Sequence, residues 1–225
     1  MAEHKEDKNI NISETLSRTE QYIEANRKKL SIILGAVIVV IAGYLIYKKI
    51  YVGGKEKEAS GLMFTAERYF RTDSLNRAIN GVKDTLGFAE ISETYGVSPS
   101  GNLAQLYLGI SYLRSGKYNE AIEALESYDG DDVMTSSLVL SAIGDAYTEL
   151  NKTEEAINHY EKASRKEPNN FATPVILMKL GLAYETAGNY AGAVEAYGQI
   201  KNDYPESSEG RDITKYIARA KAKVK

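Results

Sequence analysis

Three stretches of this chain share one pattern: GISYLRSGKYNEAIEAL (109–125), GDAYTELNKTEEAINHY (144–160) and GLAYETAGNYAGAVEAY (181–197). Their opening glycines are 35 and 37 positions apart. In each stretch a tyrosine follows after three positions, a helix-ending glycine or asparagine after seven, and an alanine after twelve. These residues are Tyr112, Tyr147 and Tyr184; Gly116, Asn151 and Gly188; and Ala121, Ala156 and Ala193. Repetition at this period predicts an array of helix pairs.

The offsets have a physical meaning in a pair of packed helices. A glycine in the first helix lets the second helix approach closely, the tyrosine fills the space between them, and the alanine permits the next crossing. Pro168 and Pro205 close the last two units, because proline cannot continue a helix. We therefore predict helix–turn–helix units over residues 102–205.

This pattern resembles the tetratricopeptide-repeat (TPR) family, whose unit of about 34 residues carries small, aromatic and proline residues at these offsets. The resemblance implies an all-α fold, a right-handed solenoid of about four helix pairs. Residues 206–225 would form a C-terminal capping helix. Residues 53–101 would hold a short linker at Gly53–Glu58 and a divergent first unit with an extra segment at 80–101. That unit follows the offsets with Ala66, Tyr69, Asp73, Ala78, Ile79 and Val82.

An uncharged run, LSIILGAVIVVIAGYLIY (30–47), precedes the repeats and is bracketed by basic residues on both sides. With Ile50, Tyr51 and Val52 it is long enough to cross the hydrocarbon core of a bilayer, about 30 Å thick. We predict a transmembrane signal anchor at 30–52, preceded by a tail at 1–29 that contains a short amphipathic helix. The candidate residues for contact with another membrane helix are small: Gly35, Ala36, Ala42 and Gly43.

The charges that flank this run do not decide its orientation. Four basic residues lie within about 20 positions of each end, so the positive-inside rule returns a tie. The cluster Arg27–Lys29 on the short side favours an N-terminus in the cytoplasm and repeats outside. A domain in the cytosol, acting as a receptor, stays open as an alternative.

The TPR resemblance also implies which residues face the concave surface of the solenoid. The candidates for a protein-binding groove are Leu103, Leu106, Ile110, Leu113, Leu138, Asp145, Val175, Met178, Leu182 and Glu185. They predict an apolar groove with acids at one edge, suited to hydrophobic segments of another polypeptide. The alternative is that other helices or a second copy of the chain cover these side chains, so self-association stays open.

Composition argues against several other functions. The net charge of −3 disfavours nucleic acid, which needs a basic face. The chain has no cysteine and two histidines, which leaves little for metal or acid–base chemistry. Asp131-Asp132 is expected to be a solvated turn rather than a calcium site. We expect no enzymatic activity, no cofactor and no metal.

The order of the parts resembles the membrane-anchored ancillary subunit of the bacterial Sec translocon, in its Bacteroidota type. The stretches QYIEANRKKLSIILGAVIVV, NLAQLYLGISYLRSGKYNEAIEAL and YGQIKNDYPESSEG carry this likeness. It implies an inner-membrane protein with periplasmic repeats that associates with the Sec channel, or with periplasmic chaperones, and assists unfolded or nascent exported polypeptides. The alternative is a scaffold for cell-envelope assembly or division that recognises one folded partner.

Overall fold

The computed structural model describes residues 12–130 and 133–224. The chain divides into two compact units, residues 1–53 and 54–225, so the boundary falls within the pair Gly53-Gly54. The predicted tail up to residue 11, and the predicted turn at Asp131-Asp132, lie outside the described residues.

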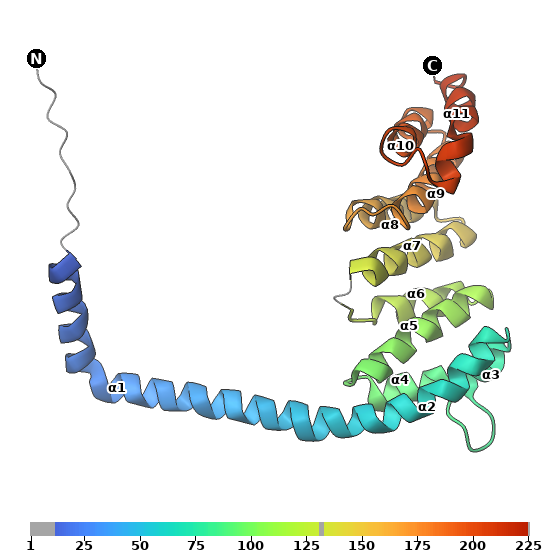
Figure 1. Cartoon of the computed structure of the whole chain (residues 1–225). Helices are drawn as coiled ribbons and strands as arrows, with labels where there is room; N and C mark the ends of the chain where they lie inside the picture. Colours follow the sequence, from blue (N-terminus) through green and yellow to red (C-terminus); the bar gives the residue numbers. More distant parts are fainter. Residues whose placement is uncertain (1–11, 131–132, 225) are drawn as a thin grey trace, which may run out of the picture. The chain divides into compact units, whose positions relative to one another are not determined.

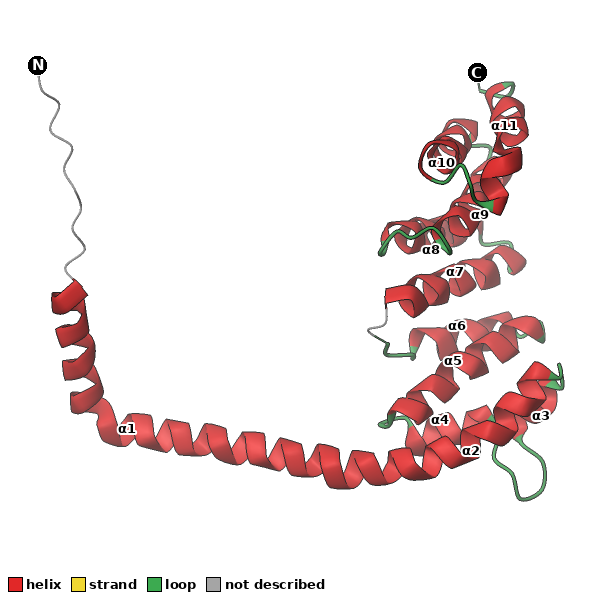
Figure 2. Ribbon diagram, viewed as in Figure 1, coloured by secondary structure: helices red, strands yellow, loops and turns green. Residues whose placement is uncertain are grey.

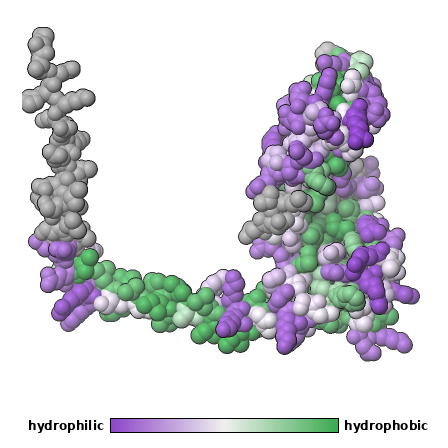
Figure 3. Space-filling view, in the orientation of Figure 1, coloured by the Kyte–Doolittle hydropathy of each residue, from purple (hydrophilic) through white to green (hydrophobic). Residues whose placement is uncertain are grey.

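The N-terminal unit is helical wherever it is described. Helix α1 (Ile12–Ile46) leads into a π-helical segment, Tyr47–Val52, in which the rings of Tyr47 and Tyr51 stack with centroids 5.3 Å apart. Within the described residues, one helix is long and apolar enough to cross a membrane, by length and composition, and it contains the predicted span. No residue of its apolar window is buried against other protein groups, as the continuous hydrophobic surface in Figure 3 shows.

The second unit is built from helices joined by short corners (Figures 1 and 2). Within its described residues the single extended pairing is an isolated bridge between Val82 and Thr85. The helices are α2 (Gly53–Arg71), α3 (Leu75–Asn80), α4 (Phe88–Tyr95), α5 (Pro99–Arg114), α6 (Tyr118–Glu126), α7 (Val133–Glu149), α8 (Thr153–Arg165), α9 (Thr173–Thr186), α10 (Tyr190–Asp203) and α11 (Ser208–Lys221). The predicted all-α solenoid is confirmed.

Three pairs follow the predicted units, with α5, α7 and α9 as first helices and α6, α8 and α10 as second helices. The predicted close approach at the repeat glycines is confirmed by what a side chain there would meet. A Cβ added at Gly109 or Gly144 would lie 2.6 Å from Leu125 or the Tyr160 ring. At Gly181 it would lie 2.1 Å from the Tyr197 ring. Glycine therefore lets the second helix cross directly over the first.

The corners inside the pairs also follow the repeat offsets. Gly116, Asn151 and Gly188 have φ values of 76°, 57° and 74°, and Asp73 at the same offset in the first unit has 57°. Glycine and asparagine reach this left-handed region at low cost, so they end first helices efficiently.

The first repeat unit departs from the predicted offsets at Val82. This residue was expected to pack as part of a second helix, but α3 ends at Asn80 and Val82 lies exposed in a loop. Gly81, with φ 75°, turns the chain out of the helix. Helix α4 then begins at Phe88, which is fully buried and stacks on Tyr107 at 5.1 Å. The extra segment thus splits the second helix in two.

The predicted linker at Gly53–Glu58 is helical instead, as the first turn of α2. Tertiary contacts hold this turn in place. The Glu56 carboxylate accepts hydrogen bonds from the backbone N–H and the hydroxyl of Ser100, both at 2.7 Å, and Ala59 is fully buried. Packing therefore overrides the low helix propensity of the two glycines.

Helix α11 closes the other end by packing on α9 and α10. Its apolar stripe includes Ile213 and Ala220, both buried, while the ring of Tyr216 lies 5.6 Å from that of Tyr197. The hydroxyl of Ser207 accepts from the backbone N–H of Gly210 and caps the helix. It acts as the predicted C-terminal cap.

Candidate protein-binding groove

The groove residues predicted from the sequence lie on α5, α7 and α9, the first helices of three successive pairs. Four of them keep a large exposed apolar surface. Leu103 is 37 % exposed, Leu138 49 %, Val175 39 % and Leu182 43 %. Hydrophobic side chains gather over α5, α6 and α7 in the face that Figure 3 shows. These four residues, called the leucine row below, are apolar side chains that a bound partner can still cover.

Other predicted groove residues hold the repeats together. Leu106, Ile110 and Leu113 are half-buried and pack against a core cluster that includes Val139 and Ile143. Met178 is half-buried against the next cluster, beside Leu177 and Leu180. The apolar surface open to a partner is therefore narrower than the sequence pattern indicates, because part of it joins neighbouring first helices.

The two predicted acids do not form a free edge, because both are already bonded within the domain. The Asp145 carboxylate accepts from the Tyr160 hydroxyl at 2.8 Å and from the Lys179 ammonium at 2.7 Å. The Glu185 carboxylate accepts from the Tyr197 hydroxyl at 2.8 Å and from the Arg219 guanidinium at 2.7 Å. Their charges are locally balanced.

The two sites share one architecture. In each, a tyrosine of the second helix passes the repeat glycine and donates a hydrogen bond to an acid on the first helix. A cation from the first helix of the next pair, or from the capping helix α11, pairs with the same acid. Burial raises the pKa of Tyr160 and of Tyr197, so both hydroxyls stay protonated donors. Burial alone would raise the pKa of Glu185, but the hydrogen bonds from Arg219 and Tyr197 outweigh it and hold that pKa below its ordinary value.

Sequence reasoning missed the cations Lys179 and Arg219. The signal available was the tyrosine sixteen positions after Gly144 and Gly181, with an acid close to each glycine. The unit that starts at Gly109 has Leu125 at this offset and therefore cannot make the same bond.

A shallow pocket of about 310 Å³ lies where the C-terminal part of α7 meets residues of α5, α6 and α8. The hydroxyl of Tyr118 spans it to donate to the Glu149 carboxylate at 3.1 Å. Its walls are Leu113, Tyr118, Asp145, Thr148, Glu149 and Tyr160. A pocket of this size and mixed lining suits one side chain of a bound polypeptide.

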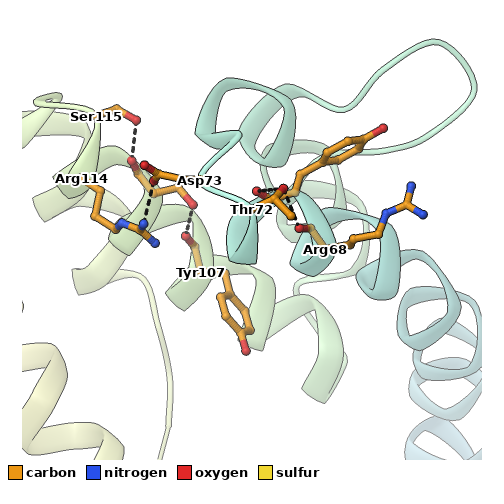
Figure 4. A network of polar contacts seen from close by, with 8 residues as sticks. Arg68, Thr72, Asp73, Tyr107, Arg114 and Ser115 are labelled. Carbon is orange, nitrogen blue, oxygen red and sulfur yellow. Dashed lines mark hydrogen bonds and ion pairs between the residues drawn. The ribbon is translucent and has the colours of Figure 1, made fainter.

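An ion pair connects the first two repeat units at the C-terminal ends of their first helices, α2 and α5 (Figure 4). The Arg114 guanidinium donates to the Asp73 carboxylate at 2.6 Å and also lies 4.9 Å from the centre of the Phe70 ring. The pair joins the end of α2 to the end of α5 at the surface of the domain, where both side chains are exposed.

The small residues predicted for membrane-helix contact, Gly35, Ala36, Ala42 and Gly43, lie on α1 and are exposed. Nothing lies within 4 Å of a Cβ built at Gly35 or Gly43. Their role in helix contact stays a prediction.

No group of three or more His, Asp and Glu side chains that would suit a metal ion occurs in the described part of the chain. His159 packs against Tyr147, with ring centres 5.3 Å apart. Burial and nearby Lys162 lower its pKa, which favours the neutral ring of a packing residue.

Family profiles match three parts of the chain. Residues 144–188 match a profile described as TPR repeat, residues 176–207 one described as tetratricopeptide repeat, and residues 91–163 one described as anaphase-promoting complex, cyclosome, subunit 3. A Guillardia theta protein called ycf37, itself uncharacterised, is 33 % identical over 97 residues. That alignment covers 41 % of this chain and 53 % of the relative, so the chain spans about half of its length.

Solved structures show the same fold. Two crystal structures of a Podosopora anserina protein described as a kinesin light chain with nearly identical TPR-like repeats superpose with a TM-score of 0.57. They cover 75 % of this chain and 87 % of their own, at 18 % identity. Together with the helix pairs and the profile matches, this likeness shows that the chain carries tetratricopeptide repeats, which form a scaffold for contact with other proteins.

Proposed function

We propose that this chain is a single-pass inner-membrane protein whose repeats bind hydrophobic segments of newly exported polypeptides. The observation that carries the proposal is the leucine row, which leaves one or two large apolar side chains exposed on each of three successive first helices. Extended apolar segments are the ligands that such a surface suits.

The electrostatics of the groove support an apolar ligand over a basic one. Asp145 and Glu185 are the acids that a basic peptide would need, and Lys179 and Arg219 already pair with them. A basic ligand would have to displace these internal cations, whereas an apolar ligand gains from covering the leucine row.

Binding is tested with a double variant of the row, Leu138→Ser and Leu182→Ser, in the full-length protein. Each half-exposed leucine should contribute about 1 kcal/mol of binding free energy when a ligand covers it. Loss of both contributions should weaken the affinity for a permanently unfolded polypeptide about 30-fold. Phe171→Ser is the matched control, because Phe171 is 84 % exposed but lies outside the row. Equal affinity in the double variant and the wild type would rule out the groove. Leu106 and Ile110 are unsuitable targets, since polar groups there would disturb the core.

We further propose association with the Sec channel through the apolar helix, with the N-terminus in the cytoplasm and the repeats in the periplasm. The order of a single apolar helix followed by repeats supports this assignment. Co-purification from membranes in mild detergent, followed by mass spectrometry, tests it. The Sec channel should be recovered, and it should be lost when residues 1–52 are exchanged for another anchor. Recovery of one envelope-assembly partner without the channel would favour the scaffold function instead.

Topology has its own test. The chain has no cysteine, so a single Phe171→Cys variant carries one exposed thiol. In cells with a permeable outer membrane and an intact inner membrane, a membrane-impermeant maleimide should label it. Labelling that requires lysis of the inner membrane would place the repeats in the cytosol.

A further inference from the structure

The corner between α4 and α5 is fastened to the first turn of α2. It comprises residues 95–100, with the sequence YGVSPS. The Lys55 ammonium lies 4.8 Å from the centre of the Tyr95 ring, and the Glu56 carboxylate accepts both hydrogen bonds from Ser100. The corner therefore stays with the residues that directly follow the predicted membrane span.

Chain length alone keeps this corner near the bilayer. Three peptide units separate Val52, the end of the predicted span, from Lys55. Consecutive Cα atoms are about 3.8 Å apart, so the two Cα atoms are within about 11 Å in any orientation of the units. The headgroup layer outside the hydrocarbon core is about 5–7 Å thick on each side. The Lys55 backbone thus lies in or beside that layer, and the corner lies within reach of its side chain.

The composition of this corner differs from that of its counterparts. Four segments connect the second helix of a repeat to the next first helix or to the capping helix. The corner at residues 95–100 is the one among them without a charged residue. The other three contain charged residues, which are Asp129, Asp131 and Asp132 in the first, Lys166 and Glu167 in the second, and Glu206 in the third. At the tip of the uncharged corner Val97 is 53 % exposed. Tyrosine is enriched at membrane–water interfaces, and a lysine beside it is attracted to the phosphates of the headgroup layer.

We propose that residues 95–100 form a second membrane contact, with Val97 inserted among the lipid headgroups. The inference rests on the membrane anchor of the proposed function, but not on ligand binding. This contact restrains the repeats relative to the bilayer, since a single span by itself leaves the attached domain free to swing about its connection. The groove is then held at a fixed height above the membrane.

Single-tryptophan variants test this contact, because the chain has no tryptophan of its own. Val97→Trp reports on the corner, and Val40→Trp reports on the span. Ala187→Trp is the matched control, since Ala187 is also exposed at a corner but lies between α9 and α10. Each full-length variant is reconstituted in two sets of vesicles, made of phosphatidylcholine brominated either near the glycerol end or near the methyl end of its acyl chains, because position 40 lies near the middle of the predicted span.

We expect the bromines near the methyl end to quench Val40→Trp, and those near the glycerol end to quench Val97→Trp, at least twofold more than Ala187→Trp, with blue-shifted emission at position 97. Quenching of Val40→Trp together with equal, weak quenching at 97 and 187 would overturn the corner contact while leaving the anchor intact. Weak quenching at position 40 would overturn the anchor and this contact with it. Far-ultraviolet circular dichroism checks that each variant is folded.

Discussion

Gly181→Ala should destabilise the repeats, although alanine is the better helix former. A methyl group there would lie 2.1, 2.6 and 2.7 Å from three atoms of the Tyr197 ring, far inside van der Waals contact. The ring is fully buried and its hydroxyl is fixed on Glu185, so it cannot move aside freely. Overpacking costs about 1–3 kcal/mol, and three close contacts place this case at about 3. The higher helix propensity of alanine stabilises the helix by about 1 kcal/mol, so the free energy of unfolding should fall by about 2 kcal/mol in total.

Gly198→Ala is the matched control within the same helix pair. Gly198 lies inside α10, and nothing lies within 4 Å of a Cβ built there. Propensity then acts alone and stabilises the helix by up to about 1 kcal/mol. The two substitutions are chemically identical, yet we expect opposite signs, because only one of them meets a second helix.

Thermal unfolding of the full-length protein in detergent, followed by circular dichroism, measures both effects. For a unit of this size the melting temperature should fall by about 4–8 °C in Gly181→Ala and rise by about 2–4 °C in Gly198→Ala. Adding Tyr197→Ala removes the clash, so Gly181→Ala should become neutral or stabilising in that background. A stabilised Gly181→Ala, or equal shifts in both single variants, would refute the close-approach argument.

Three further predictions concern the corners and the ion pairs. Arg219→Ala should cost about 1 kcal/mol in urea unfolding, because its partner Glu185 is 13 % exposed. Lys215→Ala, which breaks a pair exposed on both sides, should change stability by less than about 0.5 kcal/mol, and equal losses would contradict the distinction. Asn151→Ala should lose about 1–2 kcal/mol at φ 57°, while Asn151→Gly should be neutral in the same measurement. The folded-state pKa of Glu185 is depressed, so its contribution is complete above the ordinary value of 4.5 and is lost as pH falls below it. The protection of the α11 amides against hydrogen exchange should therefore fall in acid. A protection factor, corrected for the intrinsic pH dependence of exchange, that stays constant across this pH range would argue against it.

The parts of the fold that the sequence predicts are those set by local geometry. The corner residues Gly116, Asn151 and Gly188 adopt the left-handed backbone that ends a first helix, as their spacing indicates. Gly144 and Gly181 each face a tyrosine ring on the second helix. Each requirement depends on one backbone angle or one close contact inside a repeat, so a single sequence reveals it.

The split of the first unit could not be predicted in the same way. Val82 satisfies the repeat offset, yet Gly81 ends α3 one residue earlier and Phe88 takes over the burial. The choice between these two residues depends on the rings of Phe70 and Tyr107, which enclose Phe88 from other helices. Offsets within one unit contain no information about such neighbours.

The groove shows how the same limit affects functional residues. By their positions in the TPR pattern alone, Leu113 and Leu138 are both groove residues, and Asp145 is an acid open to a ligand. The contacts that each side chain makes with the neighbouring repeat decide whether it is accessible to a partner. Leu113 packs on α7, and Lys179 from α9 neutralises Asp145. The surface that we propose for a partner is the leucine row, in which Leu138 and Leu182 keep the largest exposed fractions. A binding site of this kind gains affinity from covering apolar area, without requiring a charged anchor on its ligand. Under the proposed function, selectivity among polypeptides follows mainly from their exposed hydrophobic segments, the property that separates unfolded chains from folded ones.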